Sequence, residues 1–507
     1  MLMNRKFGLP LMVALLLLVV VFASAGSAEA SARDATWTVS VTYQNVGDAP
    51  ASLVLNFFAE GDSTPIFFDP LNGGTLAPGG GRSFWIGNVS AVSPGFNGNA
   101  VISSDQPLSS TVVQFSNDPG FRMRLLYYGF QAQDASSQFL VPTVLLNKFD
   151  RTTVFSIQNT EDEAINATVR FYDADAGGNL ASTITHAIPA NSSKFVEMDA
   201  PADTGLGSAT VFNGSAIITA VKQAGGDASV VAAANEYYTT SNLAASFEGV
   251  PISKASNTIN MATGVCERYG LDTFYAVSNS GLSGNATVTV SYNNTDGTPK
   301  AVDGPYTIGP GQKKSIRTCN PSDGTNMSNF TGSAVVTSTG NPIVVMGKAQ
   351  NSLNAGGPAT ADLFTAFLGE PVGYSEMSFS FVRWANDAQF NDPNNNGGKQ
   401  RAYLAVQNLE TTSIAVDAKY YDKNGTLVST HNMTIPGASK ANSNPSTAGA
   451  LSGAGMVNGA FGYYTDNTSG GGVILQAAAA NPTAKFIAIN RVQHPGAGED
   501  VNALPVP

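Results

Sequence analysis

The stretch that decides the fold is SVTYQNVGDAPASLVLNFF, residues 40–58. It consists of an alternating apolar and polar run, an Asn, a polar break and a second alternating run. Alternation with a period of two is typical of half-buried β-strands, and Gly, Asp and Pro are typical of the turns between them. The polar middle, with Asn45 and Asp48, is either a binding or catalytic site or only a turn between two strands.

The stretch recurs three times, which favours the turn. The other copies are VFSIQNTEDEAINATVRFY (154–172), FYAVSNSGLSGNATVTVSY (274–292) and YLAVQNLETTSIAVDAKYY (403–421). Each keeps the Asn (Asn45, Asn159, Asn279 and Asn408) while the polar residues after it change freely. A catalytic constellation would rarely keep one member and scramble its partners. We therefore interpret the Asn as a residue whose side chain binds backbone groups at the end of a strand.

Three further landmarks follow each Asn in the same order. A turn Pro comes 33, 30, 31 and 28 residues later, at Pro78, Pro189, Pro310 and Pro436. A Gly then opens another apolar strand at Gly98, Gly207, Gly332 and Gly459, and an apolar–Pro junction ends the copy at Pro142, Pro251, Pro371 and Pro505. An internal repeat of this length with short alternating strands predicts a series of antiparallel β-sandwiches of immunoglobulin-like dimensions.

The sequence therefore predicts an all-β protein with four tandem immunoglobulin-like domains. The expected boundaries are 1–30 for a signal peptide and 31–138, 139–247, 248–367 and 368–507 for the four β-sandwich repeats. Four such domains in a row would form an elongated rod. The Cys…Trp…Cys arrangement of antibody domains is absent from the sequence, so only the architecture is implied.

The repeats resemble the tandem Ig-like repeats of secreted bacterial surface and adhesive proteins. The resemblance rests on the QN-turn-strand segments, the turns at 188–190 and 435–437, and GNAVISSDQPL (98–108). Such repeats occur in adhesins, in surface-layer subunits and in the stalks of exoenzymes. The resemblance implies a role at a surface and says nothing about a ligand.

The N-terminus has the pattern of an export signal. Arg5 and Lys6 precede an apolar run from Phe7 to Ala25, and Ala28-Glu29-Ala30 has the small-x-small form of a cleavage site. The alternative is an uncleaved membrane anchor, because the run approaches the ~20 residues that span a bilayer. We expect cleavage, a mature chain that starts near Ser31, and a secreted or cell-surface location.

Composition excludes some partners. Charged residues make up 12% of the chain and the formal net charge is −11. An acidic chain without a basic cluster is a poor partner for nucleic acid. The expected partners are other copies of the chain or a protein on a surface, and extracellular glycan is the alternative. No cofactor is expected.

The only two cysteines, Cys266 and Cys319, fall in the third repeat. Export favours a disulfide between them, and in the chain-entropy model such a loop contributes on the order of 4 kcal/mol. The alternatives are two buried free thiols or a metal site, but a metal would need more thiols or nearby His. The chain has three His, far apart in sequence, at His186, His431 and His494.

Two acidic stretches invite a calcium interpretation. Asp173 and Asp175 precede Gly177, and the insert WANDAQFNDPNNNGG (384–398) offers Asp387, Asp392, Asn394 and Asn396. Calcium takes six to eight oxygen ligands, and neither stretch has the EF-hand spacing. We interpret both as turns and expect no metal. The aromatic stretches RMRLLYYGF (122–130), Tyr237-Tyr238 and Tyr463-Tyr464 are either interface patches or core, and we favour core.

An enzyme is not expected, and no catalytic residue is assigned. The sequence has no GxSxG, HExxH, P-loop or CxxC motif. A carboxylate pair for glycoside hydrolysis stays open, since such pairs have no local spacing rule. The expected function is that of a structural or adhesive extracellular protein, with glycan binding as the alternative and a hydrolase as a third class.

The first copy differs from the others in one respect. Copies two to four are each preceded by an apolar–Pro strand, and in the first copy this place falls within the signal peptide. The chain also ends in a surplus ALPVP (503–507). One hypothesis is that the tail of another molecule pairs with the first sandwich and builds a fibre. The alternative is that ALPVP closes the fourth domain.

Overall fold

The structure, a computed structural model, describes residues 32–507 except 117, 119–120, 122, 352–362 and 396. It is all-β, with 55% of residues in strands and 4% in helices. The strands form antiparallel sheets in sandwich-like pairs, as the alternating runs predict. We number the pairs as units 1 to 4. Each unit has two sheets. The axial sheet contains the strand that reaches the centre of the molecule. The hairpin sheet contains the hairpin that follows the landmark Asn.

Unit 1 has the axial sheet β4-β1-β6-β7 and the hairpin sheet β3-β2-β5. A buried cluster around Tyr43, Leu55 and Phe57 fills the space between the two sheets. The bounds are η1 (Ala32–Asp34), β1 (Trp37–Asn45), β2 (Leu53–Ala59), β3 (Ile66–Phe68), β4 (Gly81–Trp85), η2 (Ile86–Asn88), β5 (Gly98–Ser104), β6 (Leu108–Ser116), β7 (Arg124–Tyr128) and η3 (Ala132–Asp134).

Unit 2 has the axial sheet β12-β9-β14-β15 and the hairpin sheet β11-β10-β13-β8-β16. Its core is built around Phe139, Phe155 and Phe171. The bounds are β8 (Gln138–Leu146), β9 (Arg151–Asn159), β10 (Ile165–Asp173), β11 (Asn179–Ile188), β12 (Ser193–Glu197), α1 (Pro201–Thr204), β13 (Phe212–Lys222), β14 (Val230–Tyr238), β15 (Ala244–Glu248) and β16 (Val250–Pro251).

Unit 3 has the axial sheet β21-β18-β23-β24 and the hairpin sheet β20-β19-β22-β17. Tyr275 and Tyr292 stack in its core. The bounds are η4 (Ile252–Lys254), β17 (Thr258–Cys266), β18 (Leu271–Asn279), β19 (Ala286–Asn294), β20 (Pro299–Ile308), β21 (Lys313–Arg317), β22 (Phe330–Gly340), β23 (Ile343–Asn351) and β24 (Phe364–Leu368).

Unit 4 has the axial sheet β29-β26-β31-β32 and the hairpin sheet β28-β27-β30-β25-β33. Its core is built around Tyr420, Phe461 and Phe486. The bounds are β25 (Glu376–Phe379), α2 (Asp387–Phe390), β26 (Arg401–Asn408), β27 (Ile414–Tyr421), β28 (Leu427–Ile435), β29 (Lys440–Ser443), β30 (Gly472–Ala477), β31 (Phe486–His494), β32 (Ala497–Asn502) and β33 (Leu504–Pro505).

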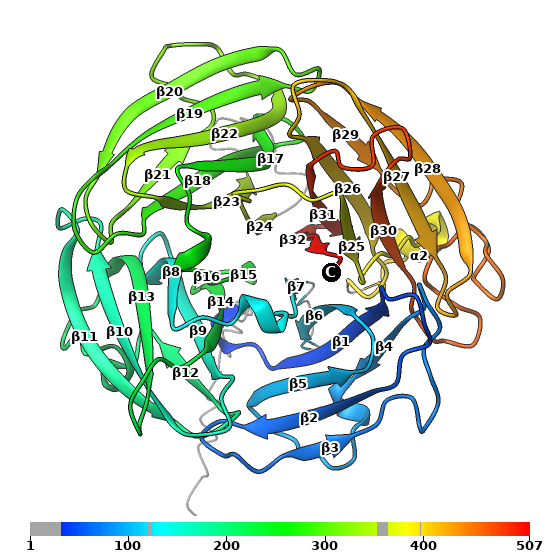
Figure 1. The fold of residues 1–507 in the computed structure, drawn as a ribbon, viewed down its shortest axis with the longest axis horizontal. Helices are drawn as coiled ribbons and strands as arrows, with labels where there is room; N and C mark the ends of the chain where they lie inside the picture. Colours follow the sequence, from blue (N-terminus) through cyan, green and yellow to red (C-terminus); the bar gives the residue numbers. More distant parts are fainter. Residues whose placement is uncertain (1–31, 117, 119–120, 122, 352–362, 396) are drawn as a thin grey trace, which may run out of the picture.

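The four units do not form a rod. Figure 1 shows them arranged around a common centre, so that unit 4 lies beside unit 1. The last strands of the axial sheets meet at this centre, where β7 and β24 each contact both β15 and β32. The expected elongated rod is therefore wrong: the chain closes into a ring whose middle is filled by four strands.

Each unit contacts the next through the turn that carries the landmark Pro. Gly311, after Pro310, lies so close to the Tyr172 ring of unit 2 that a Cβ would come within 2.6 Å of it. Gly79, after Pro78, approaches Tyr421 of unit 4 in the same way, at 2.5 Å. Both glycines have positive φ. The contact between units 2 and 3 thus recurs between units 4 and 1, which is how a repeated head-to-tail interface closes into a ring.

The C-terminal residues close unit 4 within the same molecule. In β33, Leu504 pairs with Ser378 and Pro505 with Met377 on β25. The corresponding strand of unit 2, β16, pairs with β8 in the same position. The proposed pairing of ALPVP with another molecule is therefore wrong, because its own unit already uses it.

The helices among the described residues are all too short or too polar to cross a membrane.

Candidate functional sites

The four landmark Asn side chains are structural. Each is fully buried, and its Nδ2 donates to main-chain carbonyls on both sides of the turn. In Asn408 the acceptors are the carbonyls of Thr412, Ile435 and Pro436, and Oδ1 accepts from the Glu410 N–H. All four therefore tie the hairpin turn to the landmark-Pro turn, which supports the interpretation as turn residues.

The acidic turn at Asp173 binds its own backbone. Asp173 Oδ1 accepts from the N–H groups of Asp175 and Ala176. Asp175 pairs with Lys148 at 2.8 Å, and its other oxygen accepts from Asn213 Nδ2 at 2.8 Å. These partners use Asp173 Oδ1 and both oxygens of Asp175.

The insert between β25 and β26 is ordered by its own side chains. Asn386 caps α2 by accepting from the Gln389 N–H, and Asp387 pairs with Arg401. Asp392 accepts from the Asn394 N–H, which is a local turn. Asn396 lies outside the described residues. In the described part of the insert, Asp387 and Asp392 therefore act as an ion-pair partner and a turn residue.

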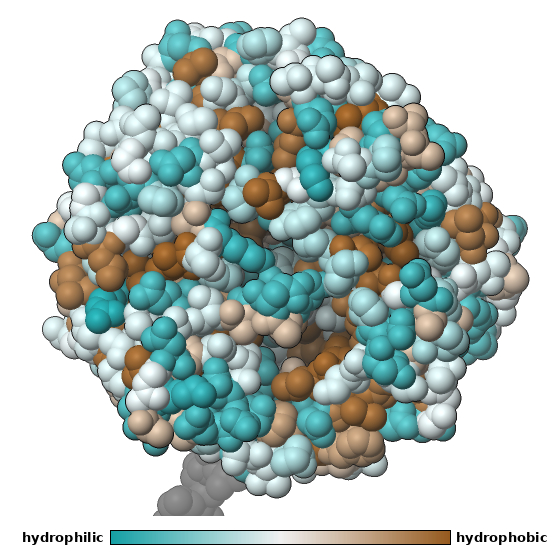
Figure 2. All heavy atoms as spheres, viewed as in Figure 1, coloured by the Kyte–Doolittle hydropathy of each residue, from teal (hydrophilic) through white to brown (hydrophobic). Residues whose placement is uncertain are grey.

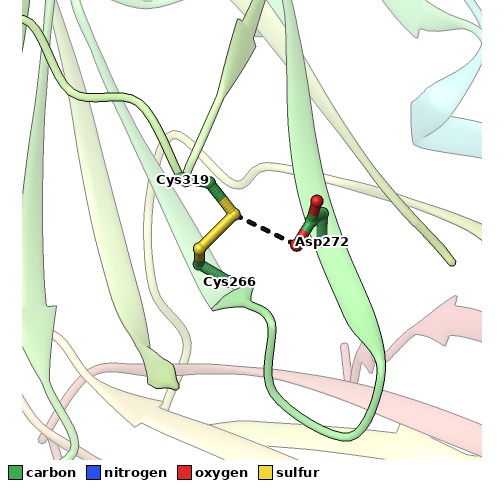
Figure 3. Close-up of side chains that lie close together, drawn as sticks. All are labelled: Cys266, Asp272 and Cys319. Atoms are coloured by element: carbon green, nitrogen blue, oxygen red, sulfur yellow. Dashed lines mark hydrogen bonds between the residues drawn. A yellow bond between two sulfur atoms is a disulfide. The ribbon is translucent and has the colours of Figure 1, made fainter. Parts of the chain in front are cut away.

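The two cysteines form the expected disulfide, which joins the end of β17 to the segment after β21. Figure 3 shows that the buried Asp272 lies beside it, with Cys319 Sγ 3.0 Å from Asp272 Oδ1. Arg317 donates to Asp272 Oδ2, and the Glu267 N–H donates to Oδ1.

This trio is the only group of three or more His, Cys, Asp or Glu among the described residues whose ligand atoms lie within 4.8 Å of one another. Thiolates are the form in which cysteine binds metals, and sulfurs joined in a disulfide are not available as thiolates. The trio in this form therefore secures the hairpin between β17 and β18 and does not hold a metal.

Carboxyl groups from several units converge at the centre of the ring. Glu248, at the end of β15, is buried and accepts from the Tyr128 N–H of β7 at 2.8 Å. Burial raises the pKa of Glu248 to about 8, and the negative charges of Glu370 and Asp134 contribute to the rise. Burial likewise raises the pKa of Glu370 to about 7. At neutral pH Glu248 is therefore mostly protonated and Glu370 is partly protonated, at the place where units 1, 2 and 3 meet.

A second acidic pair lies on β32. Arg491 binds Asp500 through two hydrogen bonds of 2.8 and 2.7 Å. The neighbouring Glu499 is fully buried, and its Oε2 has no hydrogen-bond partner among the described residues. Burial and the charge of Asp500 raise the pKa of Glu499 well above its ordinary value. A neutral acid here removes the cost of burying a second negative charge.

These axial carboxyls belong to no motif that the sequence displays. Glu248 and Glu370 occur in FEGVP and FLGEP, beside the apolar–Pro junctions at Pro251 and Pro371. A charged residue next to a repeated apolar landmark is a signal for a buried carboxyl, but the sequence does not show that these junctions meet at an axis.

One cavity bears on the hydrolase alternative. It has a volume of about 180 Å³ and lies in unit 2, between Leu146, Met198 and the segment around α1. Asp199 is the one carboxylate among its lining residues, and it contacts Arg33. General acid–base hydrolysis of a glycoside uses two carboxyl groups. The lining of this cavity does not provide such a pair.

The aromatic stretches named in the sequence analysis are largely interior. Leu125 and Leu126 of β7 are buried, as are Tyr237, Tyr463 and Tyr464. Tyr463 Oη accepts from the Gln400 N–H at 2.8 Å, and Tyr464 Oη accepts from the Lys423 N–H at 2.7 Å. This agrees with the interpretation of these residues as core. Arg122 lies outside the described residues.

Two exposed aromatic side chains occupy equivalent hairpin tips. Phe149, between β8 and β9, is 59% exposed, and Tyr269, between β17 and β18, is 72% exposed. Both have positive φ, an unusual conformation for a bulky residue, and each follows a cation (Lys148 or Arg268) that lies over its ring. Figure 2 shows that, on the face it displays, apolar residues are scattered among polar ones.

Searches with protein-family models and among curated proteins found no match to this chain.

Proposed function

We propose that the chain is an exported, non-enzymatic surface or extracellular-matrix protein. It acts through protein–protein contacts of its four units, each of immunoglobulin-like dimensions. The observation that carries this proposal is that the polar groups of the candidate sites are already bonded within the protein. The Asn side chains bind turns, Asp175 binds Lys148 and Asn213, and Asp272 binds Arg317.

The experiment is to incubate the purified mature chain with intact cells and with itself. A structural or adhesive protein is expected to bind cells saturably or to form regular particles visible by negative-stain microscopy. A chain that stays monomeric and binds no cell surface would contradict the proposal. Activity in a glycosidase or protease panel would replace it with the hydrolase alternative.

Glycan binding is the second candidate, and the exposed rings of Phe149 and Tyr269 favour it. Tyr and other aromatic rings combine an apolar face with the ability to contact polar ligands. The test is co-sedimentation of the whole chain with insoluble cell-wall polysaccharide. Loss of saturable binding in a Phe149→Ala/Tyr269→Ala variant, but not in the exposed Val302→Ala variant, would make glycan binding the primary function.

A further inference from the structure

The hairpin sheet of unit 1 ends differently from the other three. In units 2, 3 and 4 the strands β13, β22 and β30 are each paired on their second edge, by β8, β17 and β25. Their counterpart in unit 1 is β5, which among the described residues pairs with β2 alone. One edge of β5 is therefore open, and we call it the open edge.

The residues of β5 show the effect on the core. Ala100 and Ile102 face Phe57 and Leu55 across the sheet but remain half-exposed. The equivalent pairs in units 2, 3 and 4 are fully buried. These pairs are Ala216 and Ile218, Ala334 and Val336, and Val473 and Leu475. Figure 2 shows the surface hollowed close to the centre of the ring, on the side of unit 1.

The axial sheet of unit 2, which lies beside the open edge, is also less covered than the corresponding sheets of the other units. The strands β8, β17 and β25 each pack on the axial sheet of the following unit. Beneath them lie the equivalent residues Ser278, Gln407 and Gln44, all buried, and Ser278 Oγ donates to the Pro142 carbonyl of β8. Their counterpart beside the open edge is Gln158, which is half-exposed.

An orphan polar group lies at the same place. Lys313 and Lys440, at the start of β21 and β29, donate to Thr143 of β8 and Thr263 of β17. The equivalent residue of β12 is Ser193, which is 1% exposed. Its Oγ has no hydrogen-bond partner among the described residues. A buried hydroxyl without a partner is costly. In units 3 and 4 the equivalent Lys finds its partner on the strand that fills this place.

The described residues before β1, 32–36, do not fill the place. The Ala32 N–H donates to the Ser241 carbonyl of unit 2, and Arg33 pairs with Glu197. Ala35 and Trp37 pack beside Val154 of β9. They cover the part of β9 near Val154, and Ser156 and Gln158 beyond it stay half-exposed.

We propose that the open edge of β5 accepts one extended segment of another polypeptide, antiparallel to β5. The other units define its chemistry. The strands in this position read QFLVPTVLL (138–146), TINMATGVC (258–266) and EMSF (376–379). Only Glu376 is charged among them, and apolar side chains recur along each. The partner segment is therefore uncharged and largely apolar, and main-chain hydrogen bonds to the open edge supply much of its affinity.

The first arm of the test is hydrogen exchange on the purified mature chain. Amides of β5 are expected to exchange about tenfold or more faster than those of β13, β22 and β30, because an open edge leaves backbone groups in contact with water. A peptide with the sequence of β8 and lysines at its ends should then slow exchange in β5. Equal protection of β5 without any peptide would overturn the proposal, as would peptide protection confined to β3, β11, β20 or β28.

The second arm is binding of the same peptide measured by fluorescence anisotropy. Gln158→Trp places a bulky side chain beside the open edge without touching the core of unit 1, and it should weaken binding about tenfold or more. Leu180→Trp, on the exposed edge strand β11, is the matched control and should bind like the wild type. Equal effects of both variants would overturn the proposal.

Two further comparisons identify which polypeptide supplies the segment that pairs with β5. Protection of β5 that appears with rising protein concentration and no peptide would support the proposal and identify a second copy as the donor. Protection found only in a chain that retains residues 1–31 would overturn it, because the chain's own leader would then be the occupant. Peptide binding is independent of any surface role, so this proposal and the proposed function fail separately.

Discussion

At the scale of single residues, Glu248 makes the centre of the ring sensitive to pH. Its pKa is raised to about 8, chiefly by burial, whereas an unfolded Glu titrates near 4.5. The folded protein therefore binds more protons than the unfolded chain between these values. The resulting stabilisation is complete below pH 4.5 and is lost as the pH rises through about 8.

We expect Glu248→Gln to remove this loss. The amide oxygen can still accept from the Tyr128 N–H, and no charge has to be buried at high pH. At pH 9 the variant should have a free energy of unfolding about 1–3 kcal/mol greater than the wild type, with little difference at pH 4. Denaturant unfolding at both values measures it. The exposed Asp48→Asn variant is the charge-removal control, and a pH-independent difference would contradict the explanation.

The landmark Asn residues give a second prediction at this scale. Asn408→Ala leaves three carbonyls and one N–H without their buried partner, so a loss of about 2–4 kcal/mol in the free energy of unfolding is expected. Asn408→Asp should lose nearly as much, because a carboxylate cannot donate to those carbonyls. Thr411→Ala, at an exposed position of the same turn, is the control. A cost below that of the control would contradict the structural role.

At the scale of elements, two equivalent positions on β6, β14, β23 and β31 show how neighbouring units contact one another. The same positions are filled by Gln114 and Asn235 between units 1 and 2, and by Glu236 and Lys348 between units 2 and 3. Between units 4 and 1 they are Val492 and Val113, which belong to one buried cluster. An amide pair, an ion pair and an apolar pair therefore serve equivalent interfaces.

This equivalence predicts a rescue. Burial raises the pKa of Glu236, but Lys348 and Arg151 outweigh it and bring the value to about 2. Glu236→Gln leaves these two cations in the interior without their counter-ion, which should cost about 3–5 kcal/mol in the free energy of unfolding. Adding Lys348→Asn installs the pair that joins units 1 and 2. Most of the loss should then be recovered, and a double variant less stable than the single one would contradict the matching.

The strands were predictable from the sequence, and their pairing into units was partly so. Alternation along β1 and β2 and the turn chemistry around Asn45 depend on local preferences, which a sequence displays. The contacts of the landmark Asn were also foreseeable. Hydrogen bonds from its side chain to backbone groups explain why this residue is kept in all four copies while its neighbours change. The candidate acids Asp175 and Asp387 are paired with Lys148 and Arg401, which come from the turn between β8 and β9 and from β26.

At the scale of the whole molecule, closure of the ring gives a prediction about shape. A compact chain of this length has a radius of gyration of about 23 Å. Four sandwiches in a row would have roughly twice that value. Small-angle X-ray scattering of the monomer should give the smaller value. The larger one would mean that the contacts of Gly79 with Tyr421 and of Arg82 with Lys423 do not form in solution.

The ring itself could not be predicted from the sequence. The period of the repeat sets the size of a unit but contains no information on the angle between neighbours. That angle depends on close contacts such as Gly311 against Tyr172, and on side chains from four units meeting at the centre. The open edge was foreseeable in part, because the first copy lacks a preceding strand. The intramolecular use of ALPVP was the alternative to its pairing with another molecule, and the structure favours that alternative.

The open edge also sets a stoichiometry. A ring of four similar units would ordinarily offer four equivalent places, and a partner would bind with a valence of four. Among the described residues, β8, β17 and β25 occupy three of these places, so the acceptor that we propose is monovalent. Its partner must then arrive at one fixed orientation relative to the ring. A molecule with one acceptor edge therefore ends a series of subunits, unless the molecule that donates the segment also has an open edge.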